Sequence, residues 1–110
     1  PLRLKCNLQV PLPFRSEEKF HNFPHTDKTI WDPNWYTMIY YVNDSDGDTT
    51  IFNETFHDIP VKNFTVNQRS SPKKGRAVIF PGKYFHCGSP PQNTPSRVVL
   101  NCNFILTPHQ

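Results

Sequence analysis

Short runs of β-forming residues, separated by proline, glycine and aspartate turns, recur along the chain and constrain its fold more than any other feature. The clearest run is YTMIYYVN at residues 36–43, and the turn DSDGD follows it directly. Runs of this composition bounded by turn residues are typical of β-strands, and no window shows a helical period. We therefore predict about eight short strands, at residues 2–10, 20–27, 36–43, 49–52, 61–68, 76–80, 84–87 and 97–106.

The number and spacing of these strands indicate an all-β sandwich or barrel. The chain has 110 residues, so we expect one domain over residues 1–110. The sequence starts at Pro1, inside a predicted strand and without a methionine. We therefore expect a fragment of a longer chain, whose N-terminal elements are missing.

Composition and charge exclude several classes of protein. The formal net charge of +3 is too small to imply nucleic-acid binding, although it suits a small anionic ligand. No apolar run is long enough to cross a membrane. The three cysteines, Cys6, Cys87 and Cys102, do not suggest a disulfide framework. We expect a reducing, cytoplasmic location.

The tripeptide His25-Thr26-Asp27 is the first candidate for chemistry. Residues two positions apart on a strand share a face, so the imidazole and the carboxylate are expected to point into one cavity. With His86 as a third ligand they match the facial triad of non-haem Fe(II) oxygenases, which leaves metal positions open. A lone H-x-D is a weak signal, and a polar turn after Pro24 would explain it equally well.

Arg97 opens the last predicted strand, RVVLNCNF. A buried arginine needs an anionic partner, and its planar fork matches a carboxylate. By itself, an edge arginine paired with a surface acid is an equally simple interpretation. Strand parity also predicts that Val99, Asn101 and Asn103 face inward with Arg97. The two asparagine side chains then need partners, either a polar cavity with a ligand or the neighbouring backbone.

The whole pattern resembles a known family. The order HTD, YYVN, DGDTTIF, PKKGRAVIF, FHCGSPP and SRVVLNCNF, over about residues 23–106, is similar to the 2-oxoglutarate/Fe(II) dioxygenase superfamily, and most similar to its prolyl-4-hydroxylase-like branch. The resemblance implies a double-stranded β-helix, or jelly roll, with the metal between two sheets. It also implies oxidative decarboxylation of 2-oxoglutarate to succinate and CO2, coupled with substrate hydroxylation.

The resemblance assigns roles to individual residues. Fe(II) is expected on His25, Asp27 and His86, and the far carboxylate of 2-oxoglutarate on Arg97, which together form the catalytic set. A tyrosine of the YY-x-N strand contacts that carboxylate in relatives, and here it corresponds to Tyr41. By parity with Tyr41 and Arg97, we also place Thr37, Asn101 and Asn103 at the co-substrate. O2 is the second co-substrate, and ascorbate is expected to stimulate the reaction.

The chain departs from the branch in two ways. Asp46-Gly47 stands where a glycine pair is common, and the usual N-terminal helices are absent. These departures leave substrate recognition open, and we expect a peptide or small molecule as the primary substrate. The resemblance also points to a bacterial or viral source.

Three alternatives differ in sequence. A nucleic-acid demethylase on the same scaffold would carry a second arginine shortly after Arg97, and none is present. A cupin would need H-x-H where residues 25–27 read H-T-D. A non-catalytic jelly-roll binding or structural module would not need the four-residue set.

Overall fold

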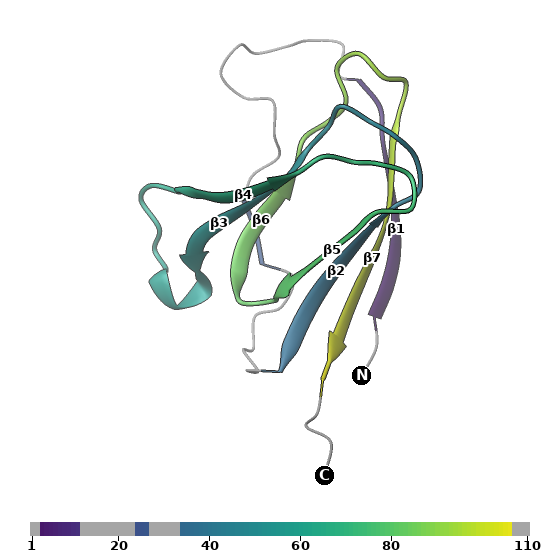
Figure 1. The fold of residues 1–110 in the computed structure, drawn as a ribbon. Coiled ribbons are helices and arrows are strands. Elements are labelled where there is room, and N and C mark those ends of the chain that lie inside the picture. The colour runs from purple at the N-terminus through teal and green to yellow at the C-terminus, as the bar shows by residue number, and fades with distance from the viewer. Residues whose placement is uncertain (1–2, 12–23, 27–33, 107–110) are drawn as a thin grey trace.

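The computed structural model describes residues 3–11, 24–26 and 34–106, and Figure 1 draws them in colour. Within these residues there are seven strands and one short 3-10 helix, η1, at Phe56–Asp58. The strands are β1 (Arg3–Gln9), β2 (Trp35–Tyr41), β3 (Thr49–Thr55), β4 (Val66–Ser70), β5 (Ala77–Pro81), β6 (Tyr84–Gly88) and β7 (Arg97–Ile105). The predicted all-β class is confirmed.

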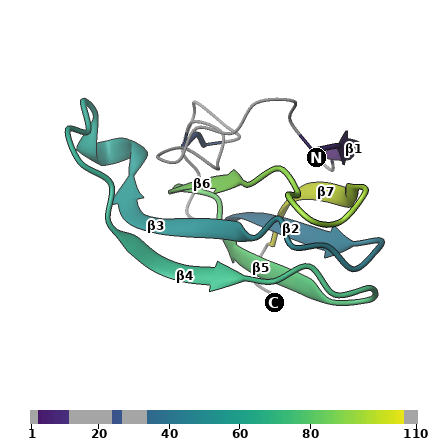
Figure 2. The same cartoon turned by 90° about the horizontal axis from the view of Figure 1, so that it is seen from above.

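The strands form two antiparallel sheets that together make the predicted double-stranded β-helix. One sheet has the order β1-β7-β2-β5, and the other has the order β4-β3-β6. Figure 2 shows both orders from above, with the three-stranded sheet on the left and the four-stranded sheet on the right. β6 and β7 are consecutive in the chain but belong to different sheets, so residues 89–96 cross from one sheet to the other.

One boundary of the predicted strands is wrong, and one predicted strand lies mostly outside the described residues. Residues 61–65 precede β4, which begins only at Val66, because β3 and its connection are longer than predicted. The Glu54 carboxylate accepts hydrogen bonds from the backbone N–H and the hydroxyl of Thr65, at 2.6 and 2.7 Å, and this closes the connection just before β4. The expected eighth strand, at 20–27, is described only at residues 24–26, where His25 forms an isolated bridge with His86.

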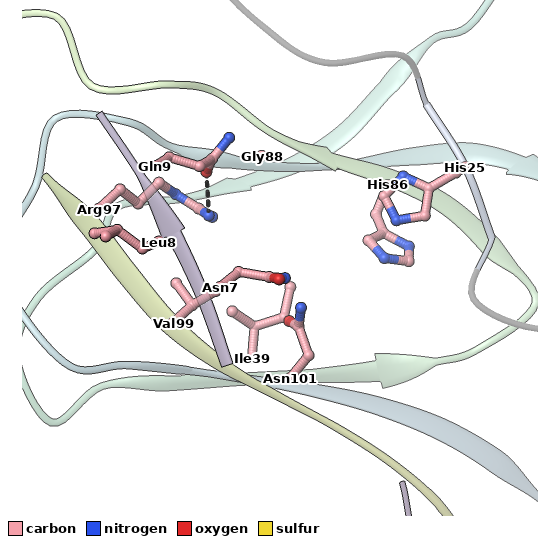
Figure 3. Close-up of a pocket in the computed structure, with 10 residues that line it drawn as sticks. All are labelled: Asn7, Leu8, Gln9, His25, Ile39, His86, Gly88, Arg97, Val99 and Asn101. Atoms are coloured by element: carbon pink, nitrogen blue, oxygen red, sulfur yellow. Dashed lines mark hydrogen bonds between the residues drawn. The ribbon is translucent and has the colours of Figure 1, made fainter. Parts of the chain in front are cut away.

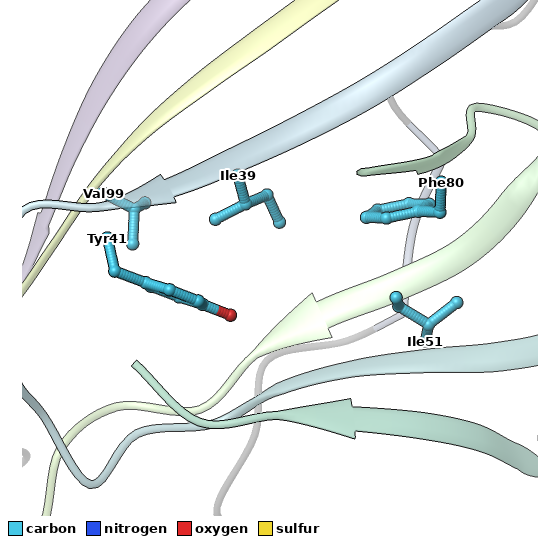
Figure 4. Packing of buried hydrophobic residues seen from close by; sticks show 5 residues of the cluster. All are labelled: Ile39, Tyr41, Ile51, Phe80 and Val99. Carbon is cyan, nitrogen blue, oxygen red and sulfur yellow. The ribbon is translucent and has the colours of Figure 1, made fainter. Parts of the chain in front are cut away.

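The core lies between the two sheets. Four residues of the four-stranded sheet, Ile39, Tyr41, Phe80 and Val99, pack with Ile51 of the other sheet (Figure 4). Alternate residues of β2 are buried, from Trp35 through Thr37 and Ile39 to Tyr41, as strand parity predicts. Burial of this face fixes the register of β2 and hence of its neighbour β7.

β1 presents its two faces differently. Leu4 and Leu8 are 64 and 67% exposed on the outer face of the sheet. The alternate residues Asn7 and Gln9 line a pocket on the inner face. The apolar alternation of this strand was predicted correctly, but its apolar face is not part of the core.

No helix among the described residues has the length and apolar character needed to cross a membrane.

Candidate active site

A pocket of about 280 Å³ lies between the two sheets and brings most of the predicted residues together. It is formed by β1, β2 and β7 on one side and by β6 and His25 on the other (Figure 3). The residues that line it are Asn7, Leu8, Gln9, His25, Ile39, His86, Gly88, Arg97, Val99 and Asn101.

His25 and His86 form one end of the site. Their backbones exchange a pair of hydrogen bonds of 3.0 and 2.9 Å, which places the two residues opposite each other. Their ring centroids are 4.5 Å apart, with 52° between the ring planes. His25 is exposed and His86 is 4% exposed, so the pair spans the wall from solvent to interior. Two imidazoles this close can both bind one divalent ion.

The surroundings of His86 favour a ligand role for its outer nitrogen. Nδ1 lies 3.3 Å from the carbonyl oxygen of Tyr84, and it can donate to that oxygen when protonated. With Nδ1 as the donor, Nε2 is the nitrogen suited to bind a metal, which is the usual arrangement of a metal-binding histidine. The ring also packs edge-on against Phe80, at a centroid distance of 5.0 Å.

The neighbouring Cys87 is on the opposite face of β6 from His86, as strand alternation requires. It is fully buried, and desolvation raises the pKa of its thiol to about 11, although the positive charges of Arg97 and Arg69 oppose the shift. A thiol with this pKa is protonated at neutral pH, and the thiolate is the form that binds metal. The predicted third ligand, Asp27, lies outside the described residues. Within residues 3–11, 24–26 and 34–106 no cluster of three ligand side chains is present.

Arg97 forms the other end of the site. It is 4% exposed, and three of its nitrogens donate hydrogen bonds. Nε donates to the Gly47 carbonyl at 2.7 Å, Nη2 to the Thr49 hydroxyl at 2.6 Å, and Nη1 to the Gln9 side-chain oxygen at 2.9 Å. A guanidinium carries five N–H donors. The remaining two therefore lie one on each terminal nitrogen.

The described hydrogen-bond acceptors of Arg97 carry no charge. They are the oxygens of Gly47, Gln9 and Thr49. Desolvation lowers the pKa of Arg97, and the residues Tyr41, Cys87 and Asp48 oppose this shift. The side chain nevertheless stays charged at neutral pH. A buried cation with only neutral hydrogen-bond acceptors is costly, so a small anion at this end of the pocket would be stabilised.

Two glycines make room for the guanidinium. A Cβ added at Gly88 would lie 2.8 Å from Nη1 and 3.0 Å from Cζ of Arg97. A Cβ at Gly47 would collide with the Ser89 carbonyl oxygen and would lie 3.0 Å from Cδ of Arg97. The guanidinium therefore lies flat against backbone that only glycine permits. This explains the glycine of the Asp46-Gly47 pair.

Comparison with known proteins agrees with this geometry. The profile of the 2OG-Fe(II) oxygenase superfamily matches residues 13–105. The chain belongs to this superfamily. Among solved structures, it is similar to a novel N-substituted L-amino acid dioxygenase from Burkholderia ambifaria AMMD, determined in complex with alpha-KG. No protein in a search of curated sequences matches.

The solved dioxygenase supports the fold of this superfamily member. The TM-score is 0.61 at 12% sequence identity, and the match covers 94% of this chain. At this identity the likeness shows the jelly roll alone. The match covers 48% of the dioxygenase, so this chain spans about half of its length.

The other predicted residues of the oxygenase site divide into two groups. Asn101 lines the pocket together with Arg97, as parity predicts. Asn103 is buried and donates to the Thr37 hydroxyl at 3.0 Å, so these two bind each other. The Tyr41 hydroxyl donates to Thr49 at 2.7 Å, and its ring lies 5.9 Å from Cζ of Arg97. Contacts of these residues with co-substrate remain predictions.

Sequence reasoning did not identify Gln9, Asn7 or Thr49. Gln9 and Asn7 alternate with leucine and cysteine on β1, and polar residues at alternate positions were a usable signal for a pocket face. Thr49 begins β3 and has 0% exposure. Its position under Arg97 depends on the packing of two sheets, which strand patterns do not specify.

Hydrogen bonds of Asp46 connect the loop after β2 to the loop before β7, next to Arg97. The Asp46 carboxylate accepts hydrogen bonds from the backbone N–H groups of Gln92 and Asn93, at 3.0 and 2.7 Å, and from the Thr94 hydroxyl at 2.9 Å. Desolvation raises the pKa of Asp46, but these hydrogen bonds outweigh it and lower the pKa below its ordinary value. Because Asp46 precedes Gly47, these hydrogen bonds also position the Gly47 carbonyl, which accepts a hydrogen bond from Arg97.

Proposed function

We propose that this chain is the catalytic core of an Fe(II)- and 2-oxoglutarate-dependent dioxygenase that hydroxylates its substrate. The observation that supports this most strongly is buried Arg97, whose hydrogen-bond acceptors are all neutral, in the same pocket as a pair of adjacent histidines. A pocket with a metal-binding end and an anion-binding end suits a co-substrate that chelates a metal and carries a distant carboxylate.

His25 and His86 are suited to hold the metal, and we place Asp27 as the third ligand. Two imidazoles and one carboxylate form the facial triad that selects non-haem Fe(II) and leaves positions open. Bound Fe(II) with 2-oxoglutarate would supply O2 activation and the oxidation of the substrate. The chain supplies the arrangement of ligands, and its two sheets exclude water from the buried side of the pocket.

Arg97 is suited to hold the 5-carboxylate of 2-oxoglutarate through the N–H groups of its terminal nitrogens. The guanidinium is held in position before any ligand binds, because it donates hydrogen bonds to Gly47 and Thr49. Tyr41 contributes indirectly, because its hydroxyl donates a hydrogen bond to Thr49 and holds it in place. Preorganised donors of this kind strengthen binding, since little ordering is left to occur on association.

The primary substrate is a peptide or small molecule in this proposal. The similar solved protein is described as an N-substituted L-amino acid dioxygenase, so amino acids and peptides are the first candidates to test. A nucleic-acid demethylase remains the second candidate on this fold. It is less well supported, because β7 continues from Arg97 as VVLNCNFI without a second arginine.

The test is turnover of 2-oxoglutarate without any primary substrate. With Fe(II), ascorbate and 2-oxoglutarate, the protein is expected to release succinate slowly, and Asp27→Ala is expected to abolish this release. Asp58→Asn, in the exposed η1 turn, is the matched control and should behave as wild type. Binding of metal and 2-oxoglutarate without succinate would favour a non-catalytic binding module. Binding of neither would contradict the oxygenase function.

A further inference from the structure

Gln9 lines the pocket together with Arg97 and accepts a hydrogen bond from its Nη1. The two residues are direct partners in the antiparallel ladder between β1 and β7, so their side chains share the inner face. A guanidinium only donates, so the oxygen of the Gln9 carboxamide must face it. Figure 3 shows this arrangement, with the Gln9 nitrogen turned away from Arg97.

Gln9 differs from the other two partners of Arg97. The Gly47 carbonyl belongs to the backbone, and Thr49 has no exposed surface and is itself held by Tyr41. Gln9 is partly exposed and is the last residue of its strand. Its side chain can therefore rotate away from Arg97, while the other two acceptors stay in place.

A glutamine at this position satisfies a donor without cancelling the charge. Its amide oxygen is neutral, so the guanidinium keeps its full positive charge inside the pocket. A carboxylate adds charge attraction and a second parallel hydrogen bond, which a neutral amide oxygen does not offer to a guanidinium. An incoming carboxylate therefore gains more from Arg97 than the displaced amide loses, because the amide regains water.

We propose that Gln9 is a displaceable placeholder that covers Arg97 in the ligand-free protein and moves aside when the co-substrate carboxylate binds. The inference rests on the proposed function, since it names 2-oxoglutarate as the displacing anion. It assigns to Gln9 a control on co-substrate affinity: a side chain that binds Arg97 more weakly should strengthen 2-oxoglutarate binding, and one that binds it more tightly should weaken it.

The test uses Gln9→Met and Gln9→Glu, with calorimetry of 2-oxoglutarate in the presence of Mn(II). Methionine keeps the side-chain length but is a very weak acceptor, so we expect binding about threefold or more tighter than wild type. Glutamate places a permanent carboxylate on Arg97, and we expect binding to weaken more than about tenfold. Cys6→Ser, on the exposed outer face of the same strand, is the control and should bind as wild type.

Thermal unfolding separates a placeholder from a structural residue. Gln9→Met should lower the Tm of the ligand-free protein and enlarge the increase in Tm caused by 2-oxoglutarate. Weaker binding of 2-oxoglutarate to Gln9→Met would overturn the proposal, because it would show that Gln9 contacts the ligand. Failure of the proposed function looks different: wild type and Arg97→Met would then bind 2-oxoglutarate equally, or neither would bind it.

Discussion

Replacing Arg97 with methionine should separate binding from stability. The substitution removes three hydrogen bonds, to Gly47, Thr49 and Gln9. Bonds from a charged donor each contribute about 1.5–3 kcal/mol. The substitution also removes a buried cation, whose desolvation costs several kcal/mol when no anion offsets it. The two contributions have opposite signs and similar size, so we expect the free energy of unfolding to change by less than about 2 kcal/mol.

Binding of 2-oxoglutarate has no such compensation. Loss of a buried, hydrogen-bonded charge partner costs about 2–5 kcal/mol, which is a decrease in affinity of about 30- to 4,000-fold. Arg97→Lys should recover only part of this loss, because one ammonium cannot reproduce the guanidinium fork. Calorimetry with Mn(II) measures the affinities, and urea unfolding measures the stabilities. Equal affinity of all three proteins would refute the anion site, and a stability loss above about 4 kcal/mol would show that Arg97 is mainly structural.

Four further results are expected. His86→Ala should weaken Mn(II) binding at least about tenfold by loss of a ligand, measured by metal titration. Gly88→Ala should weaken 2-oxoglutarate binding and leave Mn(II) affinity nearly unchanged, because the new Cβ meets the Arg97 guanidinium at 2.8 Å. Tyr41→Phe should lower both stability and 2-oxoglutarate affinity by about 0.5–1.5 kcal/mol, the contribution of one neutral hydrogen bond. The lowered pKa of Asp46 stabilises the fold above the ordinary carboxyl pKa of about 4, and this contribution is lost as the pH falls through the lowered value; Asp46→Asn should flatten that part of the pH profile in thermal unfolding.

Strand parity accounts for much of what the sequence predicts correctly. Alternation along β2 places Thr37, Ile39 and Tyr41 on one buried face, and alternation along β7 places Arg97 and Asn101 in the pocket. These predictions succeed because a strand has two faces and one of them must be buried. The strand predicted at residues 20–27 stays a prediction, because the structure describes only residues 24–26 of it, where His25 forms a bridge with His86.

Contacts between sheets and at strand ends were beyond prediction. Nothing local to Thr49 says that its hydroxyl accepts from Arg97, which lies 48 residues away in the chain. The predicted start of β4 was wrong for a similar reason, since the Glu54 carboxylate fixes Thr65 from 11 residues away. Side-chain hydrogen bonds between residues this far apart in the chain depend on tertiary packing, and local secondary-structure propensities do not predict them.

The connection between β6 and β7 determines how the two ends of the pocket are related. His86 belongs to the three-stranded sheet and Arg97 to the four-stranded sheet, and residues 89–96 are the direct covalent link between these strands. Asp46 holds this link from the side, and the carbonyl of the next residue, Gly47, accepts from Arg97. The position of the anion-binding end therefore depends on a loop contact, whereas backbone hydrogen bonds join His25 and His86 directly. Substitutions in this loop should for that reason alter co-substrate affinity before they alter metal affinity.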